Sequence, residues 1–186
     1  MPFTETELQG LIVFQPDVYE DSRGYFFESF NEKVFKAGGI ETRFIQDNQS
    51  SSFYGVIRGL HYQLNPRAQS KLVRVLSGKI LDVVVDIRKG SSTFGKTFTL
   101  ELSAENHKQL FIPKGFAHGF SVLSEKAEVF YKCDEFYSRE NEGGIRYDDP
   151  ELGIDWCIPG EKRIVSAKDE GFPSFAGSRN NFVFTE

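Results

Sequence analysis

The chain has 186 residues, with 22 basic and 27 acidic side chains, so its formal net charge at neutral pH is −5. This balance argues against nucleic-acid binding as the main task, while local arginines and lysines still allow a small anionic ligand. The length suits a single domain over residues 1–186, and the 19 phenylalanines suit the interior of a β-barrel.

The first residues, MPFTETELQG, lack the basic head and apolar run of a secretion signal. No apolar stretch approaches the roughly 20 residues that a membrane span needs. We therefore expect a cytoplasmic protein in which Cys133 and Cys157 are free thiols.

Short apolar or alternating segments, separated by glycine and proline turns, follow one another along the chain and predict strands. The predicted strands are 8–15, 25–30, one that contains Ile57 and His61, and then 71–77, 79–87, 97–102, 116–123 and 128–134. Residues 44–50 are expected to form a strand or an extended segment, and residues 109–112 lead into a turn at 113–115. A short helix is predicted at 31–37, with Asn31 as its N-cap and Gly38 at its end. A polar loop is expected at 137–144, and a short helix or turn at 166–169. This pattern indicates an all-β jelly roll with a few short peripheral helices.

The stretch Gly55–Gly78 is predicted to form a strand, a turn-rich loop and a second strand. With the period of two that strands have, His61 shares a face with Ile57, and Lys71 shares a face with Val73. Burial of a charge is costly unless it is paired. A lone inward histidine is more simply a core residue, but a histidine and a lysine on adjacent strands together indicate a site.

Charged side chains elsewhere leave two interpretations open. Asp82 shares a face with Ile80 and Val84 and would point inward, unless a bulge exposes it. Arg23 and Glu28 flank an aromatic run and are either ligand-binding groups or a solvated arginine and an edge glutamate.

The central stretch resembles the first signature of the cupin superfamily, a glycine, five residues, His-x-His, a later glutamate and a closing glycine. Gly55 and His61 match it, but Gln63 and Lys71 stand where the second histidine and the glutamate would be. The second signature, Pro-x-Gly-x-x-His, is matched by Pro113–His118. A divalent metal needs three or four convergent histidine or carboxylate ligands. We therefore expect a cupin-like jelly-roll β-barrel without a metal, whose histidines and lysine serve another purpose.

Longer blocks narrow the resemblance. The segments QDNQSSS, GVIRGLHYQ, KLVRVLSGKILDVVVDIRKGSSTFGK and ELSAENHKQLFIPKGFAHGF, with SAKD near the end, together resemble the dTDP-4-dehydrorhamnose 3,5-epimerase family from about Gly10 to Asp169. The resemblance implies an isomerase that needs no cofactor and inverts C3 and C5 of dTDP-4-dehydro-6-deoxy-D-glucose. Its product would be dTDP-4-dehydro-L-rhamnose, in the biosynthesis of dTDP-L-rhamnose. It also implies a homodimer that binds the sugar nucleotide and binds neither nucleic acid nor membrane.

The resemblance also assigns catalytic roles. It implies that His61 is the proton acceptor, that Asp169 fixes and stabilises its imidazole, that Tyr131 is the proton donor, and that Lys71 stabilises an enolate. The substrate-binding positions that it implies are Arg23, Glu28, Gln46, Asp47, Asn48, Arg58, His118, Tyr137, Glu142 and Lys168.

Some of these positions carry more specific expectations. Tyr137 is implied to stack on the thymine ring, and Arg58 to bind the diphosphate. Strict alternation places Arg58 on the face opposite His61, so a bulge at Gly59 is needed to bring both into one site. Arg23 and Glu28 are implied to bind the nucleotide at a dimer interface, in the same or the partner subunit's site.

Three other functions remain open from the sequence. The first is an epimerase that acts at C3 only or at C5 only, which would use the same base and acid. The second is a cupin that binds a sugar nucleotide or a small acid without catalysis, although binding alone needs neither a base nor an acid. The third is a metal-dependent oxygenase, against which Gln63 and Lys71 argue.

Overall fold

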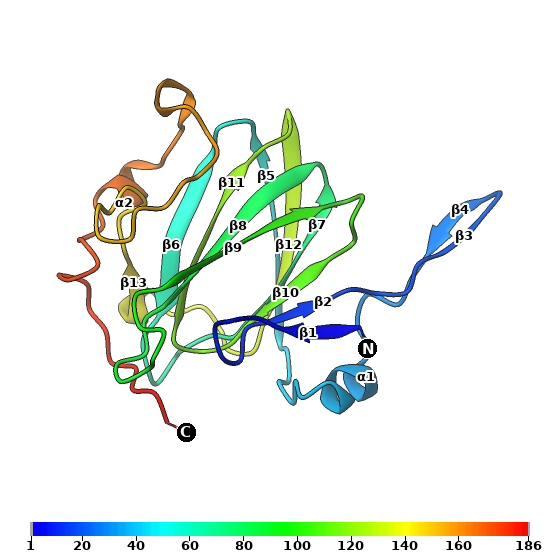
Figure 1. Ribbon diagram of the computed structural model, residues 1–186, viewed down its shortest axis with the longest axis horizontal. Coiled ribbons are helices and arrows are strands. Elements are labelled where there is room, and N and C mark those ends of the chain that lie inside the picture. The colour runs from blue at the N-terminus through cyan, green and yellow to red at the C-terminus, as the bar shows by residue number, and fades with distance from the viewer. Residues whose placement is uncertain (1, 186) are drawn as a thin grey trace.

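The computed structural model describes residues 2–185 and shows two antiparallel sheets that face each other as a jelly roll (Figure 1). In spatial order, the first sheet contains β1 (Phe3–Glu5), β2 (Ile12–Phe14), β10 (Gln109–Ile112), β7 (Lys71–Ser77), β12 (Lys126–Cys133) and β5 (Gln46–Phe53). The second contains β13 (Glu142–Gly144), β6 (Ile57–Gln63), β11 (Phe116–Val122), β8 (Lys79–Asp86) and β9 (Thr97–Ser103). The predicted all-β fold is confirmed.

Two short α-helices lie at the periphery, α1 (Glu32–Ala37) and α2 (Ala167–Glu170), with 3₁₀ turns at Arg139–Asn141 and Gly160–Lys162. Asn31 caps α1 by accepting a hydrogen bond from the Lys33 amide, as its place before the helix predicts. None of the helices in residues 2–185 is long and apolar enough to cross a membrane.

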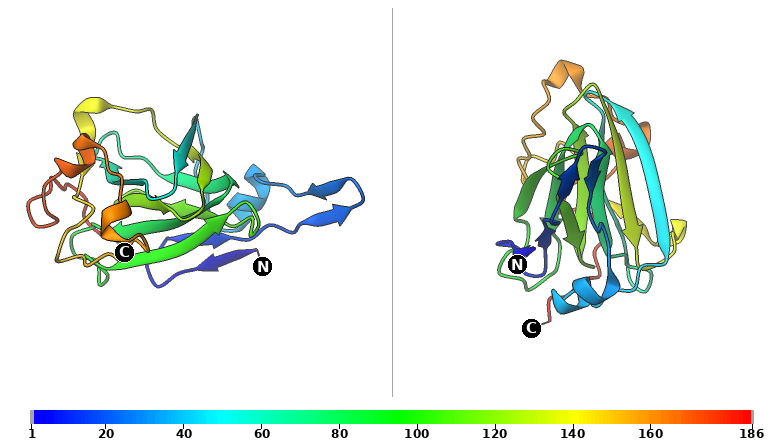
Figure 2. Two further views of the ribbon diagram at one scale, coloured as in Figure 1. Left: turned by 90° about the horizontal axis from the view of Figure 1, so that it is seen from above. Right: turned by 90° about the vertical axis from the view of Figure 1, so that its right-hand side faces the viewer.

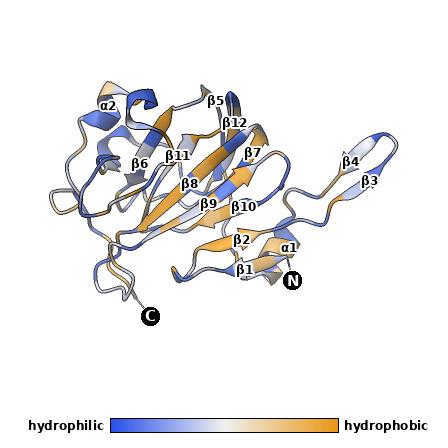
Figure 3. Ribbon diagram, turned by 45° about the horizontal axis from the view of Figure 1, so that its top comes forward, coloured by the Kyte–Doolittle hydropathy of each residue, from blue (hydrophilic) through white to orange (hydrophobic). Residues whose placement is uncertain are grey.

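Alternation along β8 divides the apolar residues into two clusters. Ile80 and Val84 belong to the cluster between the sheets, whereas Val83 and Val85 belong to a second cluster. The second cluster includes Trp156, so the C-terminal segments cover the outer face of this sheet. Figure 3 shows apolar residues gathered on β2, β7, β8 and β10. Residues of even number in β8 therefore face the interior of the jelly roll.

The structure corrects the prediction that residues 137–144 form only a loop. The last three residues are β13, which pairs with β6 in the register Glu142 with Gln63 and Gly143 with Tyr62. A Cβ atom at Gly143 would lie 2.3 Å from the Tyr62 ring, so only glycine permits this approach. The strand depends on a partner distant in the sequence, which local composition does not reveal.

A separate hairpin, β3 (Tyr19–Asp21) with β4 (Gly24–Phe26), projects far from the two sheets (Figures 1 and 2). The predicted strand 25–30 is therefore shorter and belongs to this arm. Its aromatic side chains are strongly exposed, with relative accessibilities of 66% for Tyr19 and 70% for Phe26. Such an apolar arm is typical of a surface that another chain covers.

Leu102 and Thr99 of β9 offer a test of the core. Leu102 is fully buried between the sheets, and Thr99 is exposed. We expect Leu102→Ala to lower the free energy of unfolding by about 2–5 kcal/mol, because it removes apolar burial and leaves a cavity. Thr99→Ala should cost less than about 1 kcal/mol. Urea denaturation of both variants is the measurement, and equal losses would contradict this placement of the core.

Candidate active site

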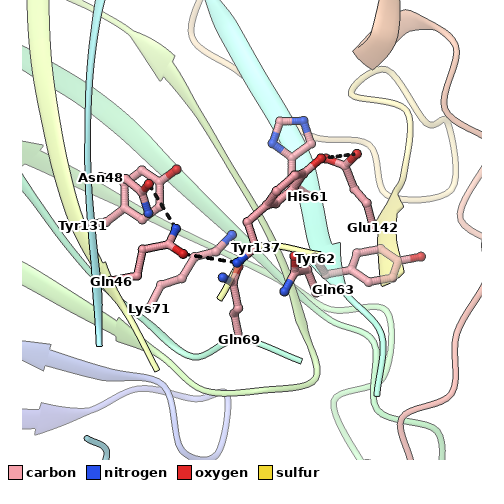
Figure 4. A pocket seen from close by; sticks show the side chains of 10 residues that line it. All are labelled: Gln46, Asn48, His61, Tyr62, Gln63, Gln69, Lys71, Tyr131, Tyr137 and Glu142. Carbon is pink, nitrogen blue, oxygen red and sulfur yellow. Dashed lines mark hydrogen bonds between the residues drawn. The ribbon is translucent and has the colours of Figure 1, made fainter. Parts of the chain in front are cut away.

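A cavity of about 160 Å³ opens between the two sheets and receives side chains from both (Figure 4). Its lining residues are Gln46, Asn48, His61, Tyr62, Gln63, Gln69, Lys71, Tyr131, Tyr137 and Glu142. A neighbouring hollow of about 150 Å³ shares His61, Lys71 and Tyr131 with it and adds Arg58 and His118. The two hollows thus meet at the residues predicted to carry the chemistry.

His61 of β6 forms a pair with Asp169 of α2. Its Nε2 lies 2.8 Å from Asp169 Oδ1, and Asp169 Oδ2 accepts a hydrogen bond from the Gly59 amide at 3.0 Å. Burial opposes ionisation of Asp169, but these bonds outweigh it and hold the pKa of the carboxyl below its usual range. Because an ionised carboxylate only accepts, His61 donates from Nε2 and keeps the lone pair on Nδ1.

The place of Asp169 is set by a short helix. Ser166 caps α2 by accepting a hydrogen bond from the Asp169 amide, and the Asp169 side chain is 5% exposed. The carboxylate is thus presented to a histidine that lies 108 residues away in the sequence. His61 itself is partly open to the cavity, with one-third of its side chain exposed.

Lys71 and Tyr131 come from the opposite sheet, on β7 and β12. In the view of Figure 4, Tyr131 and His61 lie on either side of Lys71. Burial lowers the pKa of Lys71, and burial also raises the pKa of Tyr131. Tyr131 therefore carries its proton at neutral pH, whereas burial makes the Lys71 ammonium easier to deprotonate.

Alternation on β5 separates its three polar residues. Gln46 and Asn48 line the cavity and are joined by a hydrogen bond of 3.2 Å. The side chain of Asp47 lies on the other face, where it forms an ion pair with Lys132 at 3.0 Å. The structure therefore brings Gln46 and Asn48 into the site and leaves the Asp47 side chain outside the cavity.

Two glutamines hold the loop that carries Tyr137. Gln63 Oε1 accepts the Ser138 amide at 2.6 Å, and its Nε2 donates to the Phe136 carbonyl at 3.2 Å. Gln46 Oε1 accepts the Tyr137 amide at 3.1 Å. From the sequence alone, Gln63 is expected only to replace a metal ligand. Its amide, able to donate and accept at once, was the signal for this role.

Glu142 and Lys168 form an ion pair at the rim of the cavity, with the Tyr137 hydroxyl donating to Glu142 at 3.4 Å. Glu142 is carried by β13 and Lys168 by α2. The rim therefore joins the two C-terminal elements that the sequence alone could not place beside the barrel.

Arg58 enters the same space because β6 is irregular. Four residues of β6, Arg58 to His61, lie opposite three of β11, Phe120 to His118. Gly59 has φ 130°, and a Cβ atom there would lie 2.5 Å from Gly119 Cα. This irregularity is the bulge that is needed to bring Arg58 and His61 into one site. The Arg58 side chain then lines the inner hollow and donates to Ser52 Oγ at 3.0 Å.

His118 pairs directly with His61 across β11 and β6, and its own partner is Asp82. Asp82 points inward and is fully buried, so the bulge that would have exposed it is absent from β8. Within residues 2–185 no group of three or more histidine, cysteine or acidic side chains is arranged to hold a metal ion. The expected independence from metal stays a prediction.

Arg23 and Glu28 do not reach this cavity within the chain. Arg23 lies in the projecting hairpin and forms an ion pair with Asp21. Glu28 lies beyond the hairpin and accepts a hydrogen bond from Asn31 at 3.0 Å. The structure thus leaves the two predicted nucleotide contacts outside the site of their own chain.

Comparison with known proteins identifies the family. The sequence model of dTDP-4-dehydrorhamnose 3,5-epimerase matches residues 5–177. The chain is 52% identical over 170 residues to the enzyme of that name from Shigella flexneri, covering 91% of this chain and 93% of the relative. The chain therefore has a relative of that name along nearly its whole length.

Solved structures agree with this assignment. One is a dTDP-6-deoxy-D-glucose-3,5-epimerase from Legionella pneumophila in complex with dTDP-4-keto-L-rhamnose. It is 48% identical, with a TM-score of 0.90, and the match covers 94% of this chain and 93% of that one. A 3'-monoepimerase from Streptomyces bikiniensis, in complex with dTDP-quinovose, is 32% identical with a TM-score of 0.84, covering 92% and 86%. The chain belongs to the dTDP-4-dehydrorhamnose 3,5-epimerase family and is an isomerase of that family.

Proposed function

We propose that this protein inverts both C3 and C5 of dTDP-4-dehydro-6-deoxy-D-glucose, giving dTDP-4-dehydro-L-rhamnose for dTDP-L-rhamnose biosynthesis. The observation that supports the proposal best is the pair of His61 with Asp169 facing one cavity together with Tyr131 and Lys71. A histidine with a free lone pair and a protonated tyrosine on different sheets are a base and an acid placed for transfer of a proton across a substrate.

The chemistry follows from the ketone at C4 of the proposed substrate. C3 and C5 are both next to it, so each carries a proton that a base can remove. His61 Nδ1 takes the proton, because its Nε2 is committed to Asp169. Asp169 then stabilises the imidazolium that forms.

Loss of the proton leaves an enolate, whose charge collects on the C4 oxygen. Lys71 is the cation that lines both hollows together with His61 and Tyr131, and its ammonium stabilises that charge. Tyr131 returns a proton from the other face, because its raised pKa keeps the hydroxyl protonated until it is used. Inversion is the result when removal and return occur on opposite faces.

The two hollows together suit the nucleotide and its diphosphate. Tyr137 presents an exposed ring on a loop held by two glutamines, and we assign it to the thymine base. The forked guanidinium of Arg58 suits the diphosphate oxygens. Glu142 and Lys168 at the rim, with Gln46 and Asn48 on the wall, complete the assigned binding groups.

Arg23 and Glu28 are best used by a second subunit. The hairpin that bears Arg23 projects from the barrel with exposed aromatics, and neither residue reaches its own cavity (Figure 2). A C₂ dimer would let each arm complete the partner's nucleotide site and would cover its apolar surface. The protein then works as a cytoplasmic homodimer, without metal or cofactor.

The first prediction concerns the base. We expect His61→Ala and His61→Asn to lower kcat by roughly 10²–10⁴-fold with the fold intact, because general-base catalysis is worth about that much. Asp169→Asn should lower kcat less, because it disturbs tautomer and charge and leaves the base in place. The measurement is an assay coupled to a reductase with NADPH, with circular dichroism as the control for folding. Near-normal turnover of His61→Ala would show that another residue is the base.

The second prediction separates acid from base in D₂O. Tyr131→Phe removes one hydroxyl and keeps the ring, so the enolate still forms and is reprotonated only from the His61 face. We expect this variant to lose net epimerisation but to keep substantial exchange of the C3 or C5 proton, followed by NMR. Lys71→Ala should lose both exchange and epimerisation, because the enolate becomes too costly.

Two controls accompany this experiment. Tyr54→Phe removes a hydroxyl outside the cavity and should behave as wild type. The wild-type protein should incorporate deuterium at both C3 and C5, whereas incorporation at one carbon would identify a monoepimerase. If Tyr131→Phe abolished exchange as fully as epimerisation, the tyrosine would act before the enolate forms.

The third prediction concerns the shared site. We expect light scattering to show a dimer. We also expect a mixture of Arg23→Ala and His61→Ala chains to recover activity when it is assayed at substrate concentrations below KM. In a mixed dimer, one site would then hold both intact residues, so random pairing restores about a quarter of the wild-type sites. A fully active monomer, or a mixture no more active than its two components, would exclude a shared site.

A further inference from the structure

A second histidine–carboxylate pair lies beside the cavity, and the reaction above assigns no role to its carboxylate. Asp82 of β8 is fully buried, and its Oδ2 lies 2.9 Å from His118 Nε2. Its other oxygen, Oδ1, has no hydrogen-bond partner among residues 2–185. An ionised carboxylate in this position is costly unless positive charge lies close to it.

The surroundings of Asp82 are otherwise apolar. Ile80 and Val84, its neighbours on the same face of β8, belong to the core between the sheets. Opposite it on β11 stands Phe120, also in that core. A leucine or isoleucine would suit such a position for packing alone, so the carboxylate has another use.

His118 does not supply the missing positive charge. Burial lowers the pKa of His118, and the nearby Asp82 offsets this only in part. The imidazole is therefore neutral at neutral pH, donates from Nε2 to Asp82, and leaves the Nδ1 lone pair unused. Of the two cations that line the hollow with His118, Arg58 donates to Ser52, so Lys71 is the one that remains for Asp82.

Lys71 in turn has no counter-charge in direct contact, because no carboxylate of residues 2–185 lies within ion-pair distance of it. A buried ammonium therefore depends on a carboxylate slightly further away. The titratable and charged groups that face it from the surrounding strands are His61, Asp82, His118, Tyr131, Cys133 and Glu142, with Arg58 in the inner hollow.

Most of these groups cannot balance an ammonium ion. Burial raises the pKa of Cys133 to about 11, and burial raises that of Tyr131 as well, so both are neutral near pH 7. Glu142 is already paired with Lys168. Asp82 is the carboxylate that remains for Lys71.

We propose that Asp82 is a positioning residue that acts through Lys71 and His118. Its buried carboxylate keeps the Lys71 amine in the ammonium form, and its Oδ2 orients His118 so that Nδ1 accepts a hydrogen bond from a substrate hydroxyl. The inference rests on the proposed function, in which the Lys71 ammonium stabilises the enolate.

The sign of the effect follows from the opposing influences on the pKa of Lys71. Burial lowers this pKa, and the nearby Cys133, Asp82 and Glu142 raise it. Without the charge of Asp82 the pKa falls further, and the ammonium is lost at a lower pH. The alkaline limb of the profile of kcat/KM against pH therefore moves down, while activity below the limb is retained.

The experiment compares Asp82→Asn with the wild-type protein. The amide keeps the shape and still accepts the His118 N–H bond, but carries no charge. We expect the Lys71 titration, followed by NMR of protein labelled with ¹³C at lysine Cε, to move down by about one pH unit. The alkaline limb of the kcat/KM profile should move down with it, so that kcat/KM at pH values above the limb falls about tenfold. Asp82→Leu, an apolar replacement, should shift the same titration and serves as the second variant.

Asp86→Asn is the matched control. Asp86 lies on the same strand, is equally buried, and binds Arg88, Ser91 and Thr93 away from the cavity. Its replacement should lower stability and leave the Lys71 titration unchanged.

Two results would overturn the role of Asp82. One is an unchanged Lys71 titration in both Asp82 variants. The other is a loss of activity that is equal at every pH, as a purely structural role would give. The NMR titration needs no turnover, so a wild-type protein without epimerase activity would refute the proposed function and leave this measurement intact.

Discussion

The cost of holding charge inside a β-barrel is the constraint on which the rest of this structure depends. Lys71, His61 and His118 face the space between two apolar sheets, where water screens them poorly. Each histidine is met by a buried carboxylate, Asp169 or Asp82, that comes from another element. The α2 helix brings Asp169 to His61, and the pairing of β11 with β8 brings Asp82 to His118.

Part of this arrangement could be predicted from local sequence. The alternation of β6 and β7 placed His61 and Lys71 on inward faces, and the turn glycines predicted many short strands. The bounds of β13 and the reach of α2 could not be predicted, because both depend on contacts far along the chain. Asp169 contacts His61 although 108 residues separate them in the sequence, and no periodic pattern predicts a contact over such a separation. The resemblance to a family supplied it instead.

The inward direction of Asp82 shows where pattern reasoning stops. Alternation allowed it to face the core, but the cost of a buried carboxylate argued equally for a bulge. The choice was decided by His118, which is brought opposite β8 through the pairing of β11. For Asp47 the same alternation gave the outward direction, which the segment's polar composition had obscured.

The loop of Tyr137 is held by neutral amides, and this has a consequence for how the site responds to its medium. Gln46 and Gln63 bind the backbone of three successive residues, Phe136, Tyr137 and Ser138, without any charge. Such bonds are insensitive to ionic strength and to pH over the physiological range, whereas the exposed Lys168–Glu142 pair at the rim is weakened by salt. The wall that carries Tyr137 thus keeps its shape as the salt concentration changes, and the rim is the part that added salt loosens.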